Sequence, residues 1–328
     1  MRPAFTRLLS VLWLTSLLAA RTWGQSTEPI HYTITTPAQT GLTLDGSLTL
    51  PQHPAGPPTV LLIVGGVGPT DRNGNSAYGL ASNAYQLLAD SLVGQGLAVA
   101  RYDKRYAGTN RTAALARLPK AGPTLDETVS DAVGFIRLLQ ADRRFKRVLV
   151  LGHDEGSLVG MLAARQTEAH GLISLAGAGR NLADLLKEQL APPGAPADIR
   201  AEIDGLLDSL RAGQVVHPRS VQFKAQFAPV YQPIYQSWMR YDPAEEIRAF
   251  GGPVLIIQGG RDTQLSSADA QRLRAARPAN RFVLVDQMTH QLKADAGTSL
   301  TGNRQTYNKP GLALAPGVAS LIATFARQ

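Results

Sequence analysis

The 328-residue sequence contains no cysteine. This absence excludes disulfide bonds, structural zinc sites built from thiolates, and cysteine nucleophiles. Aromatic residues make up only 6% of the chain, and no run of five or more basic residues occurs. The formal net charge of +8 is scattered along the chain, so we interpret it as a solvated surface and expect no nucleic-acid partner.

The sequence also has no hydrophobic run long enough to cross a bilayer comfortably. The longest near the N-terminus, Leu8–Ala20, follows two arginines and precedes small residues at Thr22 and Gly24. This arrangement predicts a signal peptide over residues 1–24, with a retained N-terminal anchor as the alternative. No cysteine follows the apolar run, which excludes a lipid-anchored lipoprotein. We expect an exported, periplasmic or secreted domain over residues 25–328, without stable membrane insertion once the signal is removed.

Motifs for common cofactors are missing as well. The glycine-rich segment Gly65–Asn75 has no G-K-[ST], so it is not a phosphate-binding P-loop. A calcium loop starting at Asp71 fails at its sixth and twelfth positions, which are Ser76 and Ser82 in place of glycine and glutamate. We therefore expect no cofactor and no metal, and a small-molecule substrate as the partner. The oligomeric state is left open.

Apolar runs alternate with helical patterns along most of the chain. Buried strands are predicted at residues 59–66, 97–103, 145–152, 171–177, 252–260 and 281–288. Helices are predicted at residues 83–96, 123–140, 155–166, 266–277 and 317–327. Alternation of this kind is typical of a mostly parallel, doubly wound α/β sheet covered on both faces. Residues 30–36 and 41–51 alternate apolar and polar residues and predict an antiparallel strand pair in front of it.

One region interrupts this alternation. Residues 181–250 hold helical patterns and an aromatic-rich piece but no strong buried strand. Ligands of open α/β sheets bind at the carboxyl ends of the strands. We therefore interpret residues 181–250 as a helical lid inserted over that edge of the sheet.

A strand-to-helix turn with the sequence G-H-D-E-G lies at residues 152–156. Its outline is that of G-x-S-x-G, the nucleophile elbow, in which small neighbours allow a strained turn. Here Asp154 stands where the nucleophilic serine is expected. Ser157 lies in the first turn of the following helix, so we expect its hydroxyl not to occupy the elbow position.

Two further polar residues follow later strands. Asp262 comes after the strand that ends at Gln258, and His290 lies just past the last strand. The chain order of nucleophile position, acid and histidine is that of hydrolases with a nucleophile elbow. We predict Asp154, Asp262 and His290 as the catalytic residues.

The glycine-rich loop after the first buried strand can present backbone N–H groups to an oxyanion. The N–H of the residue that follows the elbow position is the usual second donor. We predict Gly66, Val67 and Glu155 as the backbone donors of this oxyanion hole.

Four motifs in order resemble the α/β-hydrolase fold and, within it, the EstD-like esterases, also labelled serine-aminopeptidase-like hydrolases. The motifs are G-V-G-P-T-D-R-N-G-N at 66–75, R-Y-D-K-R-Y-A-G at 101–108, G-H-D-E-G-S at 152–157 and T-H-Q-L-K at 289–293. The resemblance runs from about residue 59 to the C-terminus. It implies an α/β-hydrolase fold with a helical lid, hydrolysis of a small-molecule carboxylic ester, and Asp262 and His290 as acid and base.

The sequence departs from this family at three positions around the expected pocket. Asp154 replaces the serine, Val67 replaces a small polar residue, and Tyr106 replaces a glycine. A carboxylate needs no base to activate it, and attack on carbon would give an ester of Asp154 that His290 could hydrolyse through water. Dehalogenases of this fold carry a tryptophan where Glu155 stands, which disfavours dehalogenation.

Three functional hypotheses follow. The first is a hydrolase of esterase ancestry, with Asp154 as nucleophile or general base. The second is an epoxide hydrolase in which Asp154 attacks and a tyrosine donates a proton; Tyr106, Tyr231 and Tyr235 are predicted substrate contacts, and Tyr241 is a further candidate by type. The third is a binding protein on a hydrolase scaffold that has lost its chemistry.

Overall fold

The computed structural model describes residues 26–36, 39–52, 54, 56–295 and 300–328. The predicted signal peptide at 1–24 lies outside these residues. Within the described ranges, no helix is long and apolar enough to span a membrane.

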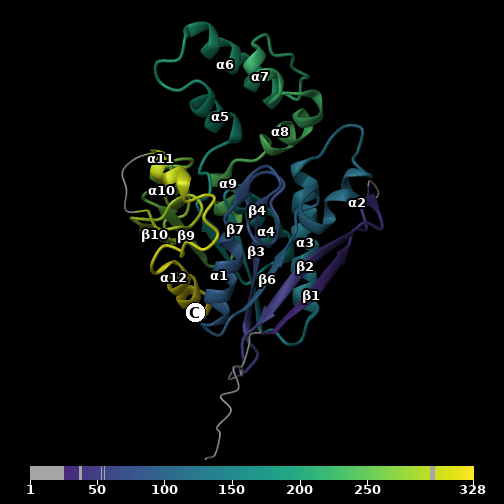
Figure 1. Cartoon of the computed structure of the whole chain (residues 1–328), viewed down its shortest axis with the longest axis vertical. Coiled ribbons are helices and arrows are strands. Elements are labelled where there is room, and N and C mark those ends of the chain that lie inside the picture. The colour runs from purple at the N-terminus through teal and green to yellow at the C-terminus, as the bar shows by residue number, and fades with distance from the viewer. Residues whose placement is uncertain (1–25, 37–38, 53, 55, 296–299) are drawn as a thin grey trace, which may run out of the picture.

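The centre of the molecule is an eight-stranded sheet in the order β1-β2-β6-β3-β7-β8-β9-β10 (Figure 1). β1 pairs antiparallel with β2, and β2 pairs antiparallel with β6; all other neighbours in this sheet are parallel. The predicted mostly parallel sheet and its antiparallel strand pair are therefore confirmed. The strands are β1 Ser26–Thr33, β2 Thr43–Leu50, β3 Thr59–Val64, β6 Ala98–Tyr102, β7 Arg147–His153, β8 Gly171–Leu175, β9 Val254–Gly259 and β10 Arg281–Val285.

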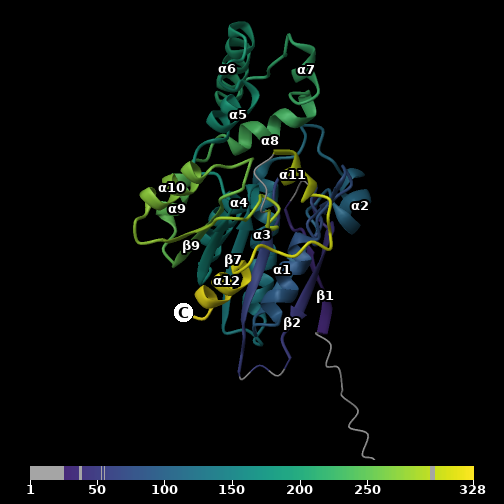
Figure 2. The same cartoon turned by 60° about the vertical axis from the view of Figure 1, so that its left-hand side comes forward.

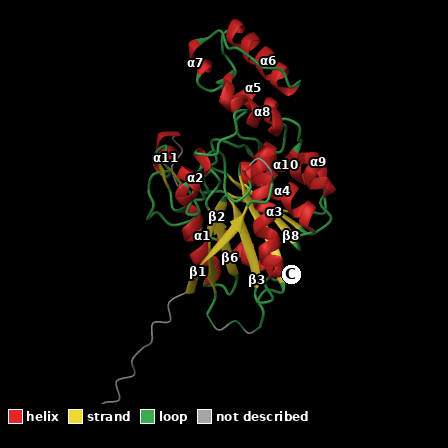
Figure 3. Ribbon diagram, turned by 90° about the vertical axis from the view of Figure 1, so that its right-hand side faces the viewer, coloured by secondary structure: helices red, strands yellow, loops and turns green. Residues whose placement is uncertain are grey.

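Helices cover both faces of the sheet, as Figure 3 shows. The helices that pack on it are α1 Ala84–Val93, α3 Leu125–Ala141, α4 Glu155–Thr167, α9 Pro243–Ala249, α10 Ser267–Ala276 and α12 Val318–Ala326. α3 begins at a capping box, in which the Thr124 side chain accepts from the Glu127 N–H and the Glu127 side chain accepts from the Thr124 N–H.

Strand β3 illustrates how the sequence builds two cores. Val60, Leu62 and Val64 join the hydrophobic cluster that includes α3 and α4, whereas Leu61 and Ile63 join the cluster that includes α1 and α12. Successive side chains of a strand point to opposite faces of the sheet. An uninterrupted apolar run in the sequence therefore indicates a strand buried on both sides.

Between β8 and β9 the chain forms helices and no strand among its described residues. α5 Leu182–Leu190, α6 Ala197–Arg211, the short α7 Val221–Lys224 and α8 Gln232–Trp238 stand together beyond one end of the sheet (Figure 2). They surround a hydrophobic cluster of their own, which includes Leu207 and Phe227. α9 instead packs against α4 and α10 beside the sheet, so the helices that stand apart from the sheet end before residue 243.

Several short elements have no strong pattern in the sequence. They are β4 Asn75–Ser76, β5 Leu80–Ala81, η2 Gly108–Asn110, α2 Arg111–Leu115, η3 Pro229–Tyr231 and α11 Leu300–Gln305. Elements of this length carry too few residues for a periodic signal. Two of them, α2 and η3, lie beside the site described next.

Candidate active site

Asp154 occupies the turn between β7 and α4 with an unusual backbone conformation. Its φ is 56° and its ψ is −120°. A non-glycine residue in this region costs about 1–3 kcal/mol, and such strain is concentrated at functional sites. The predicted elbow is therefore present in its strained form, with an aspartate at its apex.

The two glycines of the elbow are required by close backbone contacts. A Cβ atom on Gly152 would lie 2.0 Å from the Gly156 carbonyl oxygen, and one on Gly156 would lie 2.2 Å from the carbonyl oxygen of Val64. Only glycine fits at both positions. The G-x-D-x-G spacing is thus explained by the tight packing of α4 against the ends of β7 and β3.

The predicted triad residues come together at the carboxyl ends of the strands. His290 Nδ1 lies 2.9 Å from Asp262 Oδ2, and His290 Nε2 lies 3.8 Å from Asp154 Oδ2. Asp262 is held in turn by the backbone N–H groups of Gln264 and Leu265, at 2.8 and 3.0 Å. His290 therefore lies between two carboxylates, one that orients it and one at the elbow.

These contacts shift the pKa of each group. Burial opposes the charge on His290, yet the two carboxylates raise its pKa well above the usual value. Burial likewise opposes ionisation of Asp154, but the contact with His290 and the N–H of Val67 lower its pKa to about 2. Burial also opposes ionisation of Asp262, and the charge of His290 keeps its pKa below normal. At neutral pH the site is an imidazolium between two carboxylates.

The backbone donors predicted for the oxyanion hole have different partners. The Val67 N–H donates to Asp154 Oδ2 at 2.9 Å. Glu155 is the first residue of α4, so its N–H has no intrahelical acceptor. The Gly66 N–H donates to the Tyr85 hydroxyl at 2.8 Å. The prediction that Gly66 is an oxyanion donor is therefore wrong, because this N–H is already bound on the far side of the loop.

Tyr85 begins a buried chain of hydrogen bonds that ends at the backbone of His290. Its hydroxyl lies 2.8 Å from His153 Nδ1, and His153 Nε2 lies 2.8 Å from the backbone carbonyl oxygen of His290. A carbonyl only accepts, so Nε2 carries the proton. Burial and the neighbouring His290 lower the pKa of His153 to about 4, so Nδ1 is bare and Tyr85 donates to it. This chain connects the Gly66 loop to the backbone of His290.

A buried ion pair holds the other side of the same loop. Lys104 Nζ lies 2.7 Å from Glu155 Oε1 and donates to the Gly66 carbonyl oxygen at 2.9 Å. The Gly66 C=O and the Val67 N–H belong to one trans peptide group and point in opposite directions. Lys104 therefore orients the N–H of Val67 towards Asp154.

A largely apolar cavity of about 370 Å³ adjoins this loop. Val67 and Glu155 line it on the side of the sheet, and Val230, Ile234 and Trp238 line it on the side of η3 and α8. The three tyrosines predicted as substrate contacts, at positions 106, 231 and 235, all line this cavity. Pockets of about this size, apolar with a few polar groups, are typical small-molecule sites.

Two other serine and tyrosine candidates lie elsewhere. Ser157 is buried and its hydroxyl is 2.7 Å from that of Ser174, so the expectation that it does not occupy the elbow is confirmed. The Tyr241 hydroxyl donates to Asp126 at 2.9 Å, and Tyr241 does not line the cavity.

The roles of Tyr85, Lys104 and His153 were not predictable from the sequence. Lys104 belongs to the R-Y-D-K-R motif and His153 to the elbow motif, but neither motif states a partner. Tyr85 carried no signal at all, since an aromatic residue on an amphipathic helix normally belongs to the core. In the described part of the chain, no group of three or more His, Asp or Glu residues is arranged to hold a metal ion.

The architecture and the elbow define the α/β-hydrolase fold. Comparisons with known proteins agree. The serine aminopeptidase S33 family profile matches residues 77–195. Esterase EstD of Thermotoga maritima is 24% identical over 266 residues, which cover 78% of this chain and 60% of the relative. The chain therefore has the α/β-hydrolase fold and is similar in sequence to an EstD esterase, of whose length it spans about 60%.

Solved structures support the same fold. Est1E from Butyrivibrio proteoclasticus is 14% identical and superimposes with a TM-score of 0.51, over 91% of this chain and 96% of that one. The esterase domain of a Rhodothermus marinus protein is 16% identical with a TM-score of 0.52, over 92% of this chain and 98% of that one. At these identities the likeness concerns the fold alone.

Proposed function

We propose that the protein is a hydrolase of small-molecule carboxylic esters or related bonds, with Asp154, Asp262 and His290 as its triad. In this proposal the Asp154 carboxylate is the nucleophile and forms a covalent intermediate, which is a mixed anhydride after attack on an ester carbonyl and an ester after attack on a saturated carbon. The family likeness supports the hydrolase class. The geometry of the Asp154 carboxylate supports the covalent mechanism.

The observation that carries the proposal is the placement of the two Asp154 oxygens. Oδ2 accepts the N–H of Val67 at 2.9 Å, while Oδ1 has no hydrogen-bond partner among the described residues. If Oδ1 attacks, Oδ2 becomes the carbonyl oxygen of the Asp154 acyl group in the covalent intermediate. The oxygen that turns negative when water attacks that acyl carbon then already lies at an oxyanion donor.

The protonation state of His290 suits the first step. Oδ1 of Asp154 attacks the electrophilic carbon, the bond to the leaving oxygen breaks, and that oxygen takes the proton of His290 Nε2. Loss of the Asp154 charge removes one of the two carboxylates that raise the pKa of His290, so His290 remains neutral and can act as a base.

The second step returns the site to its starting state. Neutral His290 takes a proton from a water molecule that attacks Cγ of Asp154, and the negative charge on Oδ2 is bound by the Val67 N–H. Collapse breaks the bond between Cγ and Oδ1 and releases the product with that oxygen. The new carboxyl of Asp154, whose pKa is about 2, gives its proton to the departing product oxygen, which leaves Asp154 ionised and His290 protonated as at the start.

The low pKa of Asp154 favours the nucleophile role over the general-base role. A carboxylate with a pKa of about 2 is a weak base at neutral pH, so removing a proton from water is an unfavourable task for it. Nucleophilic attack needs only the ionised form.

Epoxide hydrolysis is the second candidate function. It is favoured by the ionised carboxylate and by the tyrosines that line the cavity, any of which would serve as proton donor to the ring oxygen. It also avoids the mixed anhydride that an ester substrate would form on Asp154, which is a less favourable intermediate because the carboxylate is a good leaving group.

The test is turnover of p-nitrophenyl acetate and styrene oxide in water labelled with oxygen-18. We expect label to enter the peptide that contains residue 154, measured by mass spectrometry after proteolysis. Asp154→Asn and Asp154→Ser are the variants, and Asp208→Asn, at an exposed position of α6, is the matched control. The control should incorporate label like the wild type.

The outcomes separate the hypotheses. Turnover without label on Asp154 would exclude the nucleophile role. Esterase activity in Asp154→Ser with none in the wild type would show that the wild-type protein is no esterase. No turnover of either substrate by the wild type or any variant would favour a binding protein on this scaffold. The predicted signal peptide adds a periplasmic or secreted location to the proposal.

A further inference from the structure

Among the residues that the structure describes, one charged side chain of the cavity beside Asp154 has no hydrogen-bond or ion-pair partner. Four of its lining residues form buried or half-buried ion pairs with each other: Lys104 with Glu155 at 2.7 Å, and Arg105 with Glu127 at 3.2 Å. Arg111, which also lines it, forms no hydrogen bond or ion pair among the described residues. The uncompensated charge of the cavity is therefore a single guanidinium.

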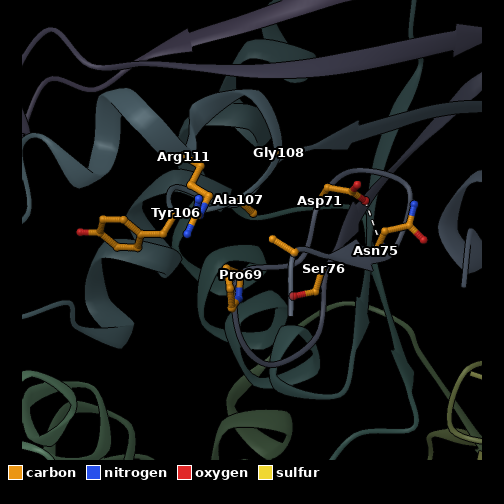
Figure 4. A pocket seen from close by; sticks show the side chains of 9 residues that line it. Pro69, Asp71, Asn75, Ser76, Tyr106, Ala107, Gly108 and Arg111 are labelled. Atoms are coloured by element: carbon orange, nitrogen blue, oxygen red, sulfur yellow. Dashed lines mark hydrogen bonds between the residues drawn. The ribbon is translucent and has the colours of Figure 1, made fainter. Parts of the chain in front are cut away.

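Arg111 lies where two cavities meet. A second, smaller cavity of about 310 Å³ shares Pro69, Tyr106 and Arg111 with the first. Figure 4 shows Arg111 and Tyr106 on one side of it and Asp71 and Asn75 on the other. A ligand in the cavity beside Asp154 therefore reaches Arg111 at the end where that cavity adjoins polar surroundings.

The apolar part of the same cavity is unusually exposed. Five of the eight exposed large hydrophobic side chains in the described part of the chain line it: Val67, Tyr78, Leu115, Val230 and Tyr231. Apolar side chains gathered at one place on a surface commonly mark a binding site, since a ligand that covers them removes apolar area from water. Their position around the cavity indicates an apolar or aromatic ligand portion.

We propose that the substrate is an amphiphile with an apolar or aromatic body and a carboxylate, and that Arg111 binds this carboxylate. The proposal rests on the hydrolase function above and names its substrate class. A guanidinium binds a carboxylate through two parallel N–H donors, a geometry that a lysine lacks. The apolar body fills the cavity beneath η3 and α8, next to Val67 and the Asp154 carboxylate.

Asp71 is the acidic group that faces the same polar end. It lines the smaller cavity but not the larger one, and its Oδ1 accepts the N–H groups of Asn73 and Asn75, each at 2.8 Å. Its negative charge opposes a carboxylate at Arg111. Removal of that charge should therefore tighten the binding of an anion.

Binding of two matched probes tests this inference without any turnover. We expect 4-phenylbutyrate to bind the wild-type protein at least about tenfold more tightly than its neutral amide, measured by isothermal titration calorimetry at low salt. Arg111→Gln should abolish this difference, and Arg111→Lys should restore only part of it. Asp71→Asn should increase it.

Arg117→Gln is the matched control, because Arg117 is exposed nearby but lines neither cavity. It should keep the preference for the acid. Equal binding of acid and amide by the wild type, or a preference that survives Arg111→Gln, would overturn the inference. Selective binding with no turnover of any ester or epoxide would instead refute the proposed hydrolysis and leave the carboxylate site standing.

Discussion

The sheet edge that carries the three predicted catalytic residues has a buried ion pair, whereas the helical insertion between β8 and β9 has an exposed one. At the sheet edge Lys104 and Glu155 are 9% and 5% exposed and bind each other. In the insertion the partners Lys187 and Asp208 are 28% and 60% exposed. The first pair holds the loop at Gly66 and Val67, because Lys104 also donates to the Gly66 carbonyl oxygen, whereas the second lies at the surface of a small separate core.

The glycines of the two regions also differ, in how much space surrounds them. Gly156 at the elbow has backbone atoms within 2.2 Å of where a Cβ would lie, and Gly205 in α6 has nothing within 4 Å. This contrast indicates that the sheet edge is fixed by packing that tolerates no change. The insertion, which contributes one wall of the cavity, has room for substitution and is suited to setting the choice of substrate.

The largest stability effect is expected from breaking the buried ion pair. Lys104→Met leaves Glu155 buried without its partner, and we expect the free energy of unfolding to fall by about 3–5 kcal/mol. The double variant Lys104→Met/Glu155→Gln should recover part of this loss. Lys187→Met, the exposed counterpart, should cost at most about 1 kcal/mol. Urea denaturation measures all three, and equal losses at the two lysines would contradict the contrast.

The second largest effect on stability is expected at Gly156, in the elbow. Gly156→Ala should lower the free energy of unfolding by about 3 kcal/mol, because its Cβ would meet the Val64 carbonyl oxygen and the backbone has to move. Gly205→Ala should raise it by about 0.5–1 kcal/mol, since alanine favours a helix interior and meets no neighbour there. Opposite signs in thermal denaturation are the expected result, and the same sign for both would refute it.

The Tyr85 chain should have an intermediate effect. Tyr85→Phe removes one hydroxyl and leaves the Gly66 N–H and His153 Nδ1 without partners, at a cost of about 2–3 kcal/mol. Tyr231, in the insertion, is 47% exposed, so Tyr231→Phe should leave the free energy of unfolding nearly unchanged. A chemical-denaturation series compares them. If Tyr85→Phe also leaves the free energy of unfolding unchanged, the hydrogen bonds of Tyr85 do not hold the loop at Gly66.

The smallest expected effect is the loss of stability when the Asp154 carboxylate is protonated at low pH. Folding lowers its pKa from 3.8 to about 2, so its contribution to stability is complete above pH 4 and is lost as the pH falls towards 2. By linkage this amounts to about 2 kcal/mol. Asp154→Asn should therefore flatten the decline of the unfolding free energy between pH 5 and 2, followed by denaturation at each pH. An unchanged slope would show that the carboxylate is not held by His290 and Val67.

Much of the sheet could be predicted from sequence, because buried strands and amphipathic helices leave periodic patterns. The apolar run at β3 and the capping box at Thr124 are local signals, and the structure has both. The C-terminal boundary of the helical insertion was harder to predict from the sequence. α9 carries a helical pattern like that of its neighbours, and only its contacts with α4 and α10 separate it from the insertion.

The site was predictable to the extent that chain order implies geometry. Asp154, Asp262 and His290 each follow a strand, and parallel strands end at one edge, so their proximity follows from topology. Gly66 was assigned wrongly because the direction of a loop N–H depends on its partner. That partner, Tyr85, lies on α1, nineteen residues away along the chain.

The sequence by itself determined that a strand-to-helix elbow exists and that an aspartate stands at its apex. Glycine spacing, hydrophobic periodicity and residue identity are properties of the chain, and they need no partner to be recognised. The tertiary structure decided which oxygen of Asp154 is bound, which loop N–H faces it, and that Arg111 lines the cavity with no ion-pair partner in the described part of the chain. These are distances between residues far apart in sequence, and they are set only when the sheet, the loop and the insertion pack together.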